Sequence, residues 1–252
     1  MLILISPAKS LDFDKQNITE IKTRPVYHSD AAKLIKTLKS LSVNEIQDLM
    51  KISYDLAKLN YDRFKNWKSR PSDEQTKQAL LAFTGEVFRG LQADSMNEED
   101  LMYAQDHLRI LSGLYGVLKP LDAIQAYRLE MGTKLNHNEF DNLYKFWGYR
   151  ITLKVNSALD ESKTIINLAS NEYFKSINKK KLKARVITPE FKEYKNGVIK
   201  MITVYAKNAR GQMTNFIIKN RVETPDELKA FDANGYEFDA NSSTDDKWVF
   251  VR

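Results

Sequence analysis

The densest group of chemically active side chains in this sequence is a run of cations in its second half. Six lysines and arginines fall within eleven residues with no acidic residue among them: Lys175, Lys179, Lys180, Lys181, Lys183 and Arg185. Tyr173 and Phe174 stand directly before this run. Cations beside aromatic rings are what contacts to phosphates and stacked bases require. The run therefore predicts a nucleic-acid contact, although a solvated lysine surface explains it equally well.

A second basic group follows later in the same half of the chain. It comprises Lys200, Lys207, Arg210, Lys219 and Arg221. If a helix begins after Gly211, its first amide groups are free to bind a phosphate. Two basic segments in one half of the chain favour a basic cleft that accepts a polyanion.

The glycines of residues 109–120 (RILSGLYGVLKP) indicate another way of binding phosphate. A helix that ends in a small, glycine-containing turn before another apolar run has the pattern of a helix-hairpin-helix. Glycines in such a hairpin let the backbone approach a phosphate and direct amide groups at it, so no base is read. The residues predicted to contact DNA here are Ser112, Gly113, Leu114, Tyr115, Gly116 and Lys119. The alternative is an ordinary helix with Gly113 as its C-cap, and Pro120 would shorten any second helix.

A third set of polar residues is a candidate pocket. It consists of Lys9, Ser10, Arg128, Glu130, Asn171 and Glu172. Carboxylates beside cations can serve acid–base catalysis, but buried ion pairs between arginine and glutamate explain the same pattern. The set therefore leaves an enzyme open as an alternative to a binding protein, and no catalytic residue is assigned.

What the sequence lacks excludes several chemistries. The chain has no cysteine, so disulfides, thiolate metal sites and thiol peroxidase chemistry are excluded. It has no Gly-x-Gly-x-x-Gly, no Walker loop and no serine nucleophile elbow. His28, His107 and His137 are isolated, and no Glu or Asp stands three residues before any of them. The sequence therefore predicts no metal site and no cofactor.

Hydrophobic periodicity predicts a mixed sheet surrounded by helices. Helices are expected over residues 29–41, 43–50, 54–67, 73–83, 101–111, 170–177 and 211–221. Strands are expected over residues 2–5, 164–168, 184–189, 192–200, 201–205 and 248–251. Ser42 and Glu45 form a capping box, and Asn196-Gly197 predicts a hairpin turn. With no repeat or linker in view, we expect one α+β domain over residues 1–252.

Charge and hydropathy limit the partners and the location. Lysine and arginine total 39 against 33 acidic residues, a net charge of +6. Such a balance suits a polyanion, although many basic enzymes bind no nucleic acid. The apolar start is only four residues long after Met1 and lacks the features of a signal peptide. No apolar stretch approaches the roughly 20 residues that span a bilayer. We therefore expect a cytoplasmic protein with no membrane partner.

A series of longer motifs resembles the YaaA family. In order they are LILISPAKSLDF (2–13), FTGEVFRGL (83–91), LRILSGLYGVLKP (108–120), YRLEMG (127–132), LYKFWG (143–148), INLASNEYFKSI (166–177) and YAKNARG (205–211). The resemblance spans nearly the whole chain. It implies a bacterial protein of the peroxide-stress response that limits iron-dependent damage. It also implies a compact single domain with a positively charged cleft and a helix-hairpin-helix that binds DNA.

The expected function is therefore DNA binding that is largely independent of sequence and protects DNA or assists its repair. RNA remains an alternative partner, and the sequence leaves the oligomeric state open. The second interpretation is an enzyme that acts on a nucleotide or nucleic acid through the candidate pocket. An iron-sequestering protein is the weakest of the three, because the paired Glu-x-x-His motifs of ferritin-like sites are missing.

Overall fold

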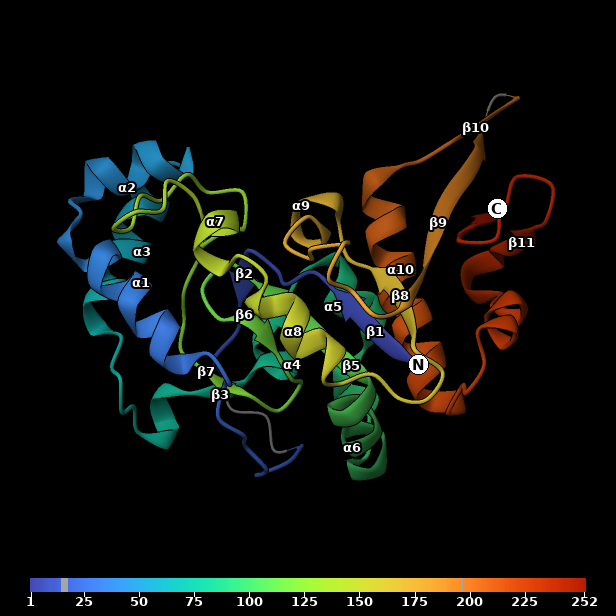
Figure 1. Ribbon diagram of the computed structural model, residues 1–252, viewed down its shortest axis with the longest axis horizontal. Helices are drawn as coiled ribbons and strands as arrows, with labels where there is room; N and C mark the ends of the chain where they lie inside the picture. The colour runs from blue at the N-terminus through green and yellow to red at the C-terminus, as the bar shows by residue number, and fades with distance from the viewer. Residues whose placement is uncertain (15–17, 196) are drawn as a thin grey trace.

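The structure, a computed structural model, describes residues 1–14, 18–195 and 197–252. Its centre is an eight-stranded sheet in the order β11-β12-β9-β8-β1-β5-β6, with β10 paired to β9. These strands are β1 (Leu2–Ile5), β5 (Leu108–Ser112), β6 (Gly116–Leu118), β8 (Thr164–Leu168), β9 (Arg185–Lys195), β10 (Val198–Lys200), β11 (Glu237–Asp239) and β12 (Lys247–Val251). Figure 1 shows helices packed around this sheet.

The central strands are parallel and buried. β1 pairs in parallel with β5 on one side and with β8 on the other, so that Ile5 lies beside Ile110 and Leu168. The continuous apolar sequence of β1 is typical of a parallel strand, because both faces of such a sheet are covered. The predicted mixed sheet surrounded by helices is confirmed. Its mostly parallel strands make the fold α/β rather than the predicted α+β.

Helices and two small sheets complete the described architecture. The α-helices are α1 (His28–Ser40), α2 (Val43–Met50), α3 (Tyr54–Asn66), α4 (Ala79–Ala82), α5 (Glu86–Leu91), α6 (Glu98–His107), α7 (Leu143–Trp147), α8 (Arg150–Asn156), α9 (Asn171–Phe174) and α10 (Thr203–Asn220). Short 3-10 helices cover Asp73–Gln75, Ala93–Ser95, Pro225–Ala230 and Ala233–Gly235. The small sheets pair β2 (Ser10–Leu11) with β4 (Phe83–Thr84), and β3 (Lys77–Gln78) with β7 (Ala123–Ile124).

The elements with strong local signals lie where the sequence predicts them. The structure confirms α1, α2 and α3, and it confirms strands β1, β8 and β12. The capping box is also confirmed: the Ser42 hydroxyl accepts from the Glu45 amide at 3.3 Å, and the Glu45 carboxylate accepts from the Ser42 amide at 2.7 Å. β9 and β10 form the predicted hairpin, although Asn196 of its turn lies outside the described residues.

Several predicted elements are wrong. Residues 73–83 do not form one helix but a 3-10 turn followed by β3 and α4. The predicted strand over residues 201–205 is replaced by the start of α10, which continues through Gly211. Gly211 sits where α10 crosses α5, since a Cβ there would lie 1.8 Å from the Val87 carbonyl oxygen. Close helix packing, not a helix start, therefore requires this glycine.

The placement of a helix-hairpin-helix at residues 109–120 is also wrong. The preceding helix, α6, ends at His107, and Leu108 already belongs to β5. β5 pairs antiparallel with β6, with Ile110 opposite Leu118 and Ser112 opposite Gly116. The segment is therefore a β-hairpin at one edge of the main sheet, and neither of its arms is a helix.

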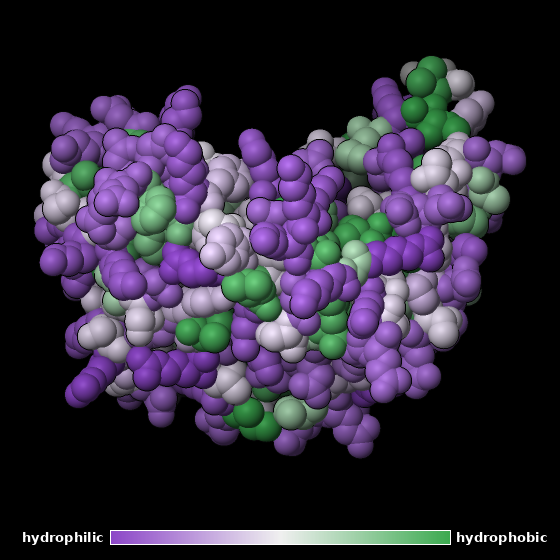
Figure 2. Space-filling view, viewed as in Figure 1, coloured by the Kyte–Doolittle hydropathy of each residue, from purple (hydrophilic) through white to green (hydrophobic). Residues whose placement is uncertain are grey.

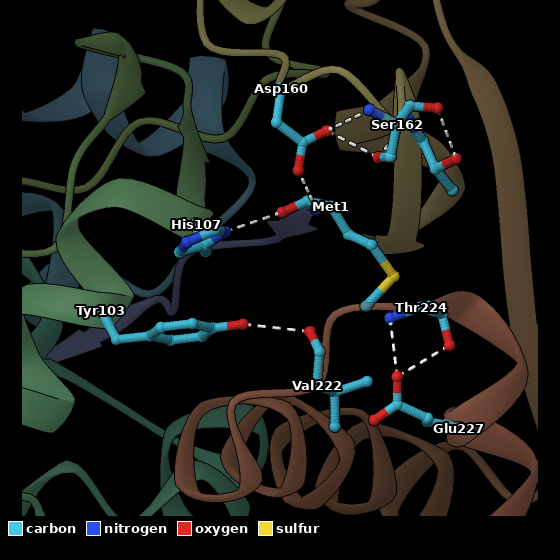
Figure 3. Close-up of polar contacts among 9 residues, drawn as sticks. Met1, Tyr103, His107, Asp160, Ser162, Val222, Thr224 and Glu227 are labelled. Carbon is cyan, nitrogen blue, oxygen red and sulfur yellow. Dashed lines mark hydrogen bonds and ion pairs between the residues drawn. The ribbon is translucent and has the colours of Figure 1, made fainter.

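Polar contacts at the amino ends of the central strands link neighbouring elements to one another (Figure 3). His107 donates from Nδ1 to the Met1 carbonyl at 3.0 Å, and its ring stacks on Tyr103 at a centroid distance of 4.1 Å. The Tyr103 hydroxyl donates to the Val222 carbonyl at 3.1 Å. These contacts join β1 and α6 to the segment after α10.

The surface is hollowed on one side. Figure 2 shows a concave upper outline between the lobe of α1–α3 and the hairpin of β9 and β10. Figure 1 places α9 between those two parts. In the described ranges, no helix combines the length and the apolar character needed to cross a bilayer.

Candidate functional site

Three loops meet where β1, β5 and β8 end. These strands are parallel neighbours, so their carboxyl ends share one edge of the sheet. The chain moves from β1 to β5 in one direction across the sheet and from β8 to β9 in the other, so the winding reverses beside β1. In α/β sheets the loops at such a reversal separate and leave a crevice where ligands bind. A ligand-binding site is therefore expected at the loops that begin at Ser6, Gly113 and Ala169.

Serine hydroxyls bridge two of these loops. The Ser170 amide donates to the Ser6 hydroxyl at 2.8 Å, and the two hydroxyl oxygens lie 3.2 Å apart. At the end of β5, the Ser112 hydroxyl lies 2.6 Å from that of Tyr127 and accepts from the Tyr115 amide at 3.0 Å. Hydrogen bonds between strand ends thus fix the loops in place.

A carboxylate shared by two cations lies beside these loops. Glu130 pairs with Lys9 at 2.6 Å and with Arg128 at 3.2 Å, through different carboxylate oxygens. The Lys9 side chain is 63% exposed, whereas that of Arg128 is only 14% exposed and its buried Nε has no hydrogen-bond partner. The exposed Lys9 ammonium can therefore meet a ligand from solvent, while Glu130, itself held by Arg128, positions that ammonium.

Glu172 connects α9 to the same segment. Its carboxylate accepts from the Gly132 amide at 2.8 Å, and its backbone carbonyl accepts from the Tyr144 hydroxyl at 2.9 Å. A Cβ on Gly132 would lie 3.1 Å from that carboxylate, so the glycine permits the close contact. We call Lys9, Arg128, Glu130 and Glu172 the strand-end cluster.

The structure thus brings together four of the six residues of the predicted pocket. Ser10 is exposed in β2 opposite Thr84, and Asn171 is exposed at the start of α9. Neither makes a side-chain hydrogen bond with another described residue.

Two buried tyrosines form the wall behind the cluster. Burial raises the pKa of Tyr127, which the hydrogen bond with Ser112 only partly offsets. Burial also raises the pKa of Tyr173, and the nearby Glu172 and Glu130 raise it further. Both phenols stay protonated near neutral pH, so they can donate hydrogen bonds but cannot act as bases. Sequence reasoning missed Tyr127 and Tyr173 as wall residues, although both lie within the quoted motifs.

No metal centre is formed by the part of the chain that the structure describes. Groups of three or more His, Asp or Glu side chains placed to hold an ion are absent there.

The residues predicted to contact DNA through a hairpin are not accessible. Ser112, Leu114 and Tyr115 are fully buried. The Gly113 carbonyl accepts from Trp147 Nε1 at 3.0 Å, and an added Cβ on Gly113 would lie 2.2 Å from the Leu129 carbonyl oxygen. The hairpin therefore packs into the core and cannot present its amides to a phosphate.

The remaining residues of that prediction are also held inward. Gly116 is buried against the ring of Trp147. Lys119 is half-buried, and its amide donates to Asp122 at 2.8 Å.

The lysine segment, by contrast, is on the surface. We give this name to Lys175, Lys179, Lys180, Lys181 and Lys183, all of which are exposed. Lys175 lies over the Tyr144 ring at 5.2 Å and Lys179 over the Phe174 ring at 5.9 Å. Arg185 pairs with Asp246 at 2.9 Å, but within the described ranges no carboxylate lies within 4.0 Å of any of the five lysines. Their charges are therefore free to meet a polyanion.

The second basic group is less exposed and more fully paired with acids than the sequence predicted. Lys207 is exposed on α10, whereas Arg210 is half-buried and burial lowers its pKa, with Glu190 opposing that shift. The amides after Gly211 are inside a continuous helix and are not free for a phosphate. Lys219 and Arg221 both pair with Asp100, at 2.6 and 2.9 Å. This group therefore offers fewer free charges than the lysine segment.

Comparisons with known proteins give one consistent result. The family model described as peroxide stress protein YaaA matches residues 1–242. A UPF0246 protein of Aliivibrio fischeri strain MJ11 is 50% identical over 254 residues, which cover 100% of this chain and 98% of the relative. UPF0246 proteins of Janthinobacterium sp. strain Marseille and Marinomonas sp. strain MWYL1 are each 49% identical and are covered to 98% and 97%.

Proposed function

This chain belongs to the family of peroxide stress protein YaaA, and from that premise we propose that it binds DNA during the peroxide-stress response. The observation that carries the proposal is the lysine segment, an exposed group of cations with no carboxylate within 4.0 Å among the described residues. Such cations neutralise phosphates and release condensed counterions, which favours binding without selecting a sequence. In this proposal the protein limits iron-dependent oxidative damage by covering the DNA to which it binds.

The hollow side of the molecule supports the same proposal. α9 directly precedes the lysine segment and lies between the lobe of α1–α3 and the β9–β10 hairpin, beneath the concave outline of Figure 2. Exposed aromatic side chains such as Tyr194 and Tyr205, on or after that hairpin, can stack on bases whatever their sequence. We infer that duplex or structured DNA lies in this basic cleft.

The test is a variant that removes four charges of the lysine segment. Lys179→Gln, Lys180→Gln, Lys181→Gln and Lys183→Gln together should weaken duplex binding and flatten the salt dependence by up to about four units. A scrambled duplex should give the same values. Fluorescence anisotropy at several salt concentrations measures both quantities.

A matched control removes the same number of charges elsewhere. Lys33, Lys58, Lys145 and Lys229 each pair with an acid three or four residues away, at 2.6 to 3.0 Å. Changing these four to Gln lowers the net charge equally, but we expect little change in the salt slope. An equal loss in both variants, or no loss in either, contradicts a contact at the lysine segment.

A second candidate function is an enzyme that acts on a nucleotide or nucleic acid. The observation in its favour is the convergence of Lys9, Glu130 and Arg128 at the reversal point of the sheet. Mass spectrometry of oligonucleotides and nucleotides incubated with the parent and with Glu130→Gln distinguishes the two functions. A product formed only by the parent supports the enzyme, while unchanged substrates and intact DNA binding in both support the binding protein.

A further inference from the structure

A basic cavity lies at the N-terminal turn of α1, separate from the strand-end cluster. Its volume is about 680 Å³, and its cations are Lys22, Arg24 and Arg70. Among the described residues, none that lines it is acidic. Figure 1 places β3 and β7, next to the start of α1, in the lower half of the view, whereas α9 is in the upper half. The cavity is therefore on a different part of the surface from the lysine segment.

The two arginines of this cavity are free. In the described ranges neither Arg24 nor Arg70 has an ion pair or a side-chain hydrogen bond, and both are exposed. Lys22 is partly engaged, since its ammonium donates to the carbonyls of Asp73 and Thr76 and lies 4.0 Å from the Asp73 carboxylate. Each guanidinium group is planar and can donate two parallel hydrogen bonds to the oxygens of a phosphate. Two such groups on one cavity therefore suit a phosphorylated ligand.

The backbone of α1 adds to the positive potential. α1 is 13 residues long, and Tyr27 at its N-cap position provides no side-chain hydrogen bond to the first turn. His28 and Ser29 of that turn line the cavity. The positive end of the helix dipole and its first amides favour an anion at this position.

A buried histidine in the cavity wall has an unused nitrogen. The His28 side chain is buried, and its Nε2 donates to the Ser69 carbonyl at 2.9 Å because a carbonyl can only accept. Its Nδ1 has no hydrogen-bond partner among the described residues. Because Nε2 carries the proton, Nδ1 is an acceptor that can receive a hydrogen bond from a water or from a ligand hydroxyl, but not from a phosphate oxygen.

We propose that this cavity binds the phosphate group of a small phosphorylated molecule of mononucleotide size. Arg24 and Arg70 hold the phosphate from one side, and the first turn of α1 holds it from the other. The volume is within the range of about 300–1,000 Å³ that small-molecule pockets occupy. Hydroxyls of Ser29, Ser69 and Thr76 line the same cavity and can orient the rest of the ligand.

Isothermal titration calorimetry with pyrophosphate and ADP tests the proposal. We expect the full chain to bind ADP at one site and the double variant Arg24→Gln with Arg70→Gln to bind it at least about tenfold more weakly. Thermal melting establishes that the variant is folded. No binding to the parent, or equal binding to the variant, overturns the proposal.

A DNA backbone also carries phosphates, so the same variants are compared in both assays. The lysine-segment variant should bind ADP like the parent, and the double arginine variant should bind duplex DNA like the parent. If the arginine variant loses DNA affinity while ADP does not bind the parent, the cavity is a DNA contact and the small-ligand assignment fails. DNA binding proposed for the lysine segment can fail without affecting the ADP result.

Discussion

Gly113 and Gly116 are required by packing and not by a ligand. An added Cβ on Gly113 meets the Leu129 carbonyl oxygen at 2.2 Å, and one on Gly116 meets the Trp147 ring at 2.9 Å. The sequence correctly marked both glycines as constrained, because small residues between apolar runs permit a close approach. It could not show what approaches them, since Trp147 and Leu129 come from distant or irregular segments. A glycine is required whether a phosphate or an indole ring approaches the backbone, so the local sequence pattern is the same in both cases.

Alanine at these glycines should reduce stability without specifically reducing DNA binding. We expect Gly113→Ala to lower the free energy of unfolding by about 3 kcal/mol, because backbone must move to relieve the clash. Gly116→Ala combines a φ of +69° with the ring contact and should cost about 2 kcal/mol. Gly235→Ala is the control: its φ is +77° with no atom within 4 Å of the added Cβ, so it should cost about 1 kcal/mol.

Urea titration of the three variants measures these differences, and DNA affinity is measured below the unfolding transition. Folded Gly116→Ala protein that loses most of its DNA affinity would contradict the buried hairpin and restore a phosphate contact there.

Among the elements, those with their own start signals were predictable. α1 was predictable from its amphipathic spacing alone, whereas α2 and α3 also have serine N-caps, at Ser42 and Ser53, which fix where these two helices begin. The run Leu108–Leu111 carries no such signal. A short apolar run is compatible with a buried strand or with the end of a helix, and only its pairing with β1 decides. The same ambiguity explains the error over residues 73–83, where β3 forms only because β7 is beside it.

The capping box of α2 should have a measurable effect. Ser42→Ala removes the hydroxyl that accepts from the Glu45 amide, so the free energy of unfolding should fall by about 1 kcal/mol. Ser40→Ala is the matched control, because Ser40 ends α1 and its hydroxyl only donates to the Thr37 carbonyl of its own helix. Chemical denaturation compares the two. Equal effects would show that the cap does not hold the start of α2.

For the whole molecule, the sequence indicated four polar residues that meet, together with Ser10 and Asn171, which do not join them, and it did not show their surroundings. Lys9 lies far along the chain from Arg128 and Glu130, and the prediction that they meet followed from their place in motifs of specific appearance. The parallel order of β1, β5 and β8 brings those loops to one edge, and strand order across a sheet is set by long-range pairing that periodicity does not reveal. The Ser6–Ser170 bridge depends on that same order. The lysine segment was visible from sequence because charge runs need no long-range information.

Under the proposed function, protection of DNA is what would connect the family's peroxide-stress role with the surface charge. The chain has no cysteine, so its own thiols cannot consume peroxide. Protection by coverage requires only that the protein stay bound where iron and peroxide would otherwise attack. It should therefore follow DNA occupancy, and it should decline with salt as binding does.

Supercoiled plasmid treated with ferrous iron and peroxide provides the measurement. At a concentration that saturates the plasmid, the parent should reduce nicking several-fold, and the four-lysine variant of residues 179–183 should protect clearly less at the same concentration. The control that removes Lys33, Lys58, Lys145 and Lys229 should protect like the parent, because those ammonium groups are already paired with acids on the surface. If the four-lysine variant protects as well as the parent although its DNA affinity has fallen, coverage is not the cause. Protection would then have to come from another part of the molecule, such as the strand-end cluster, and Glu130→Gln would be the next variant to compare.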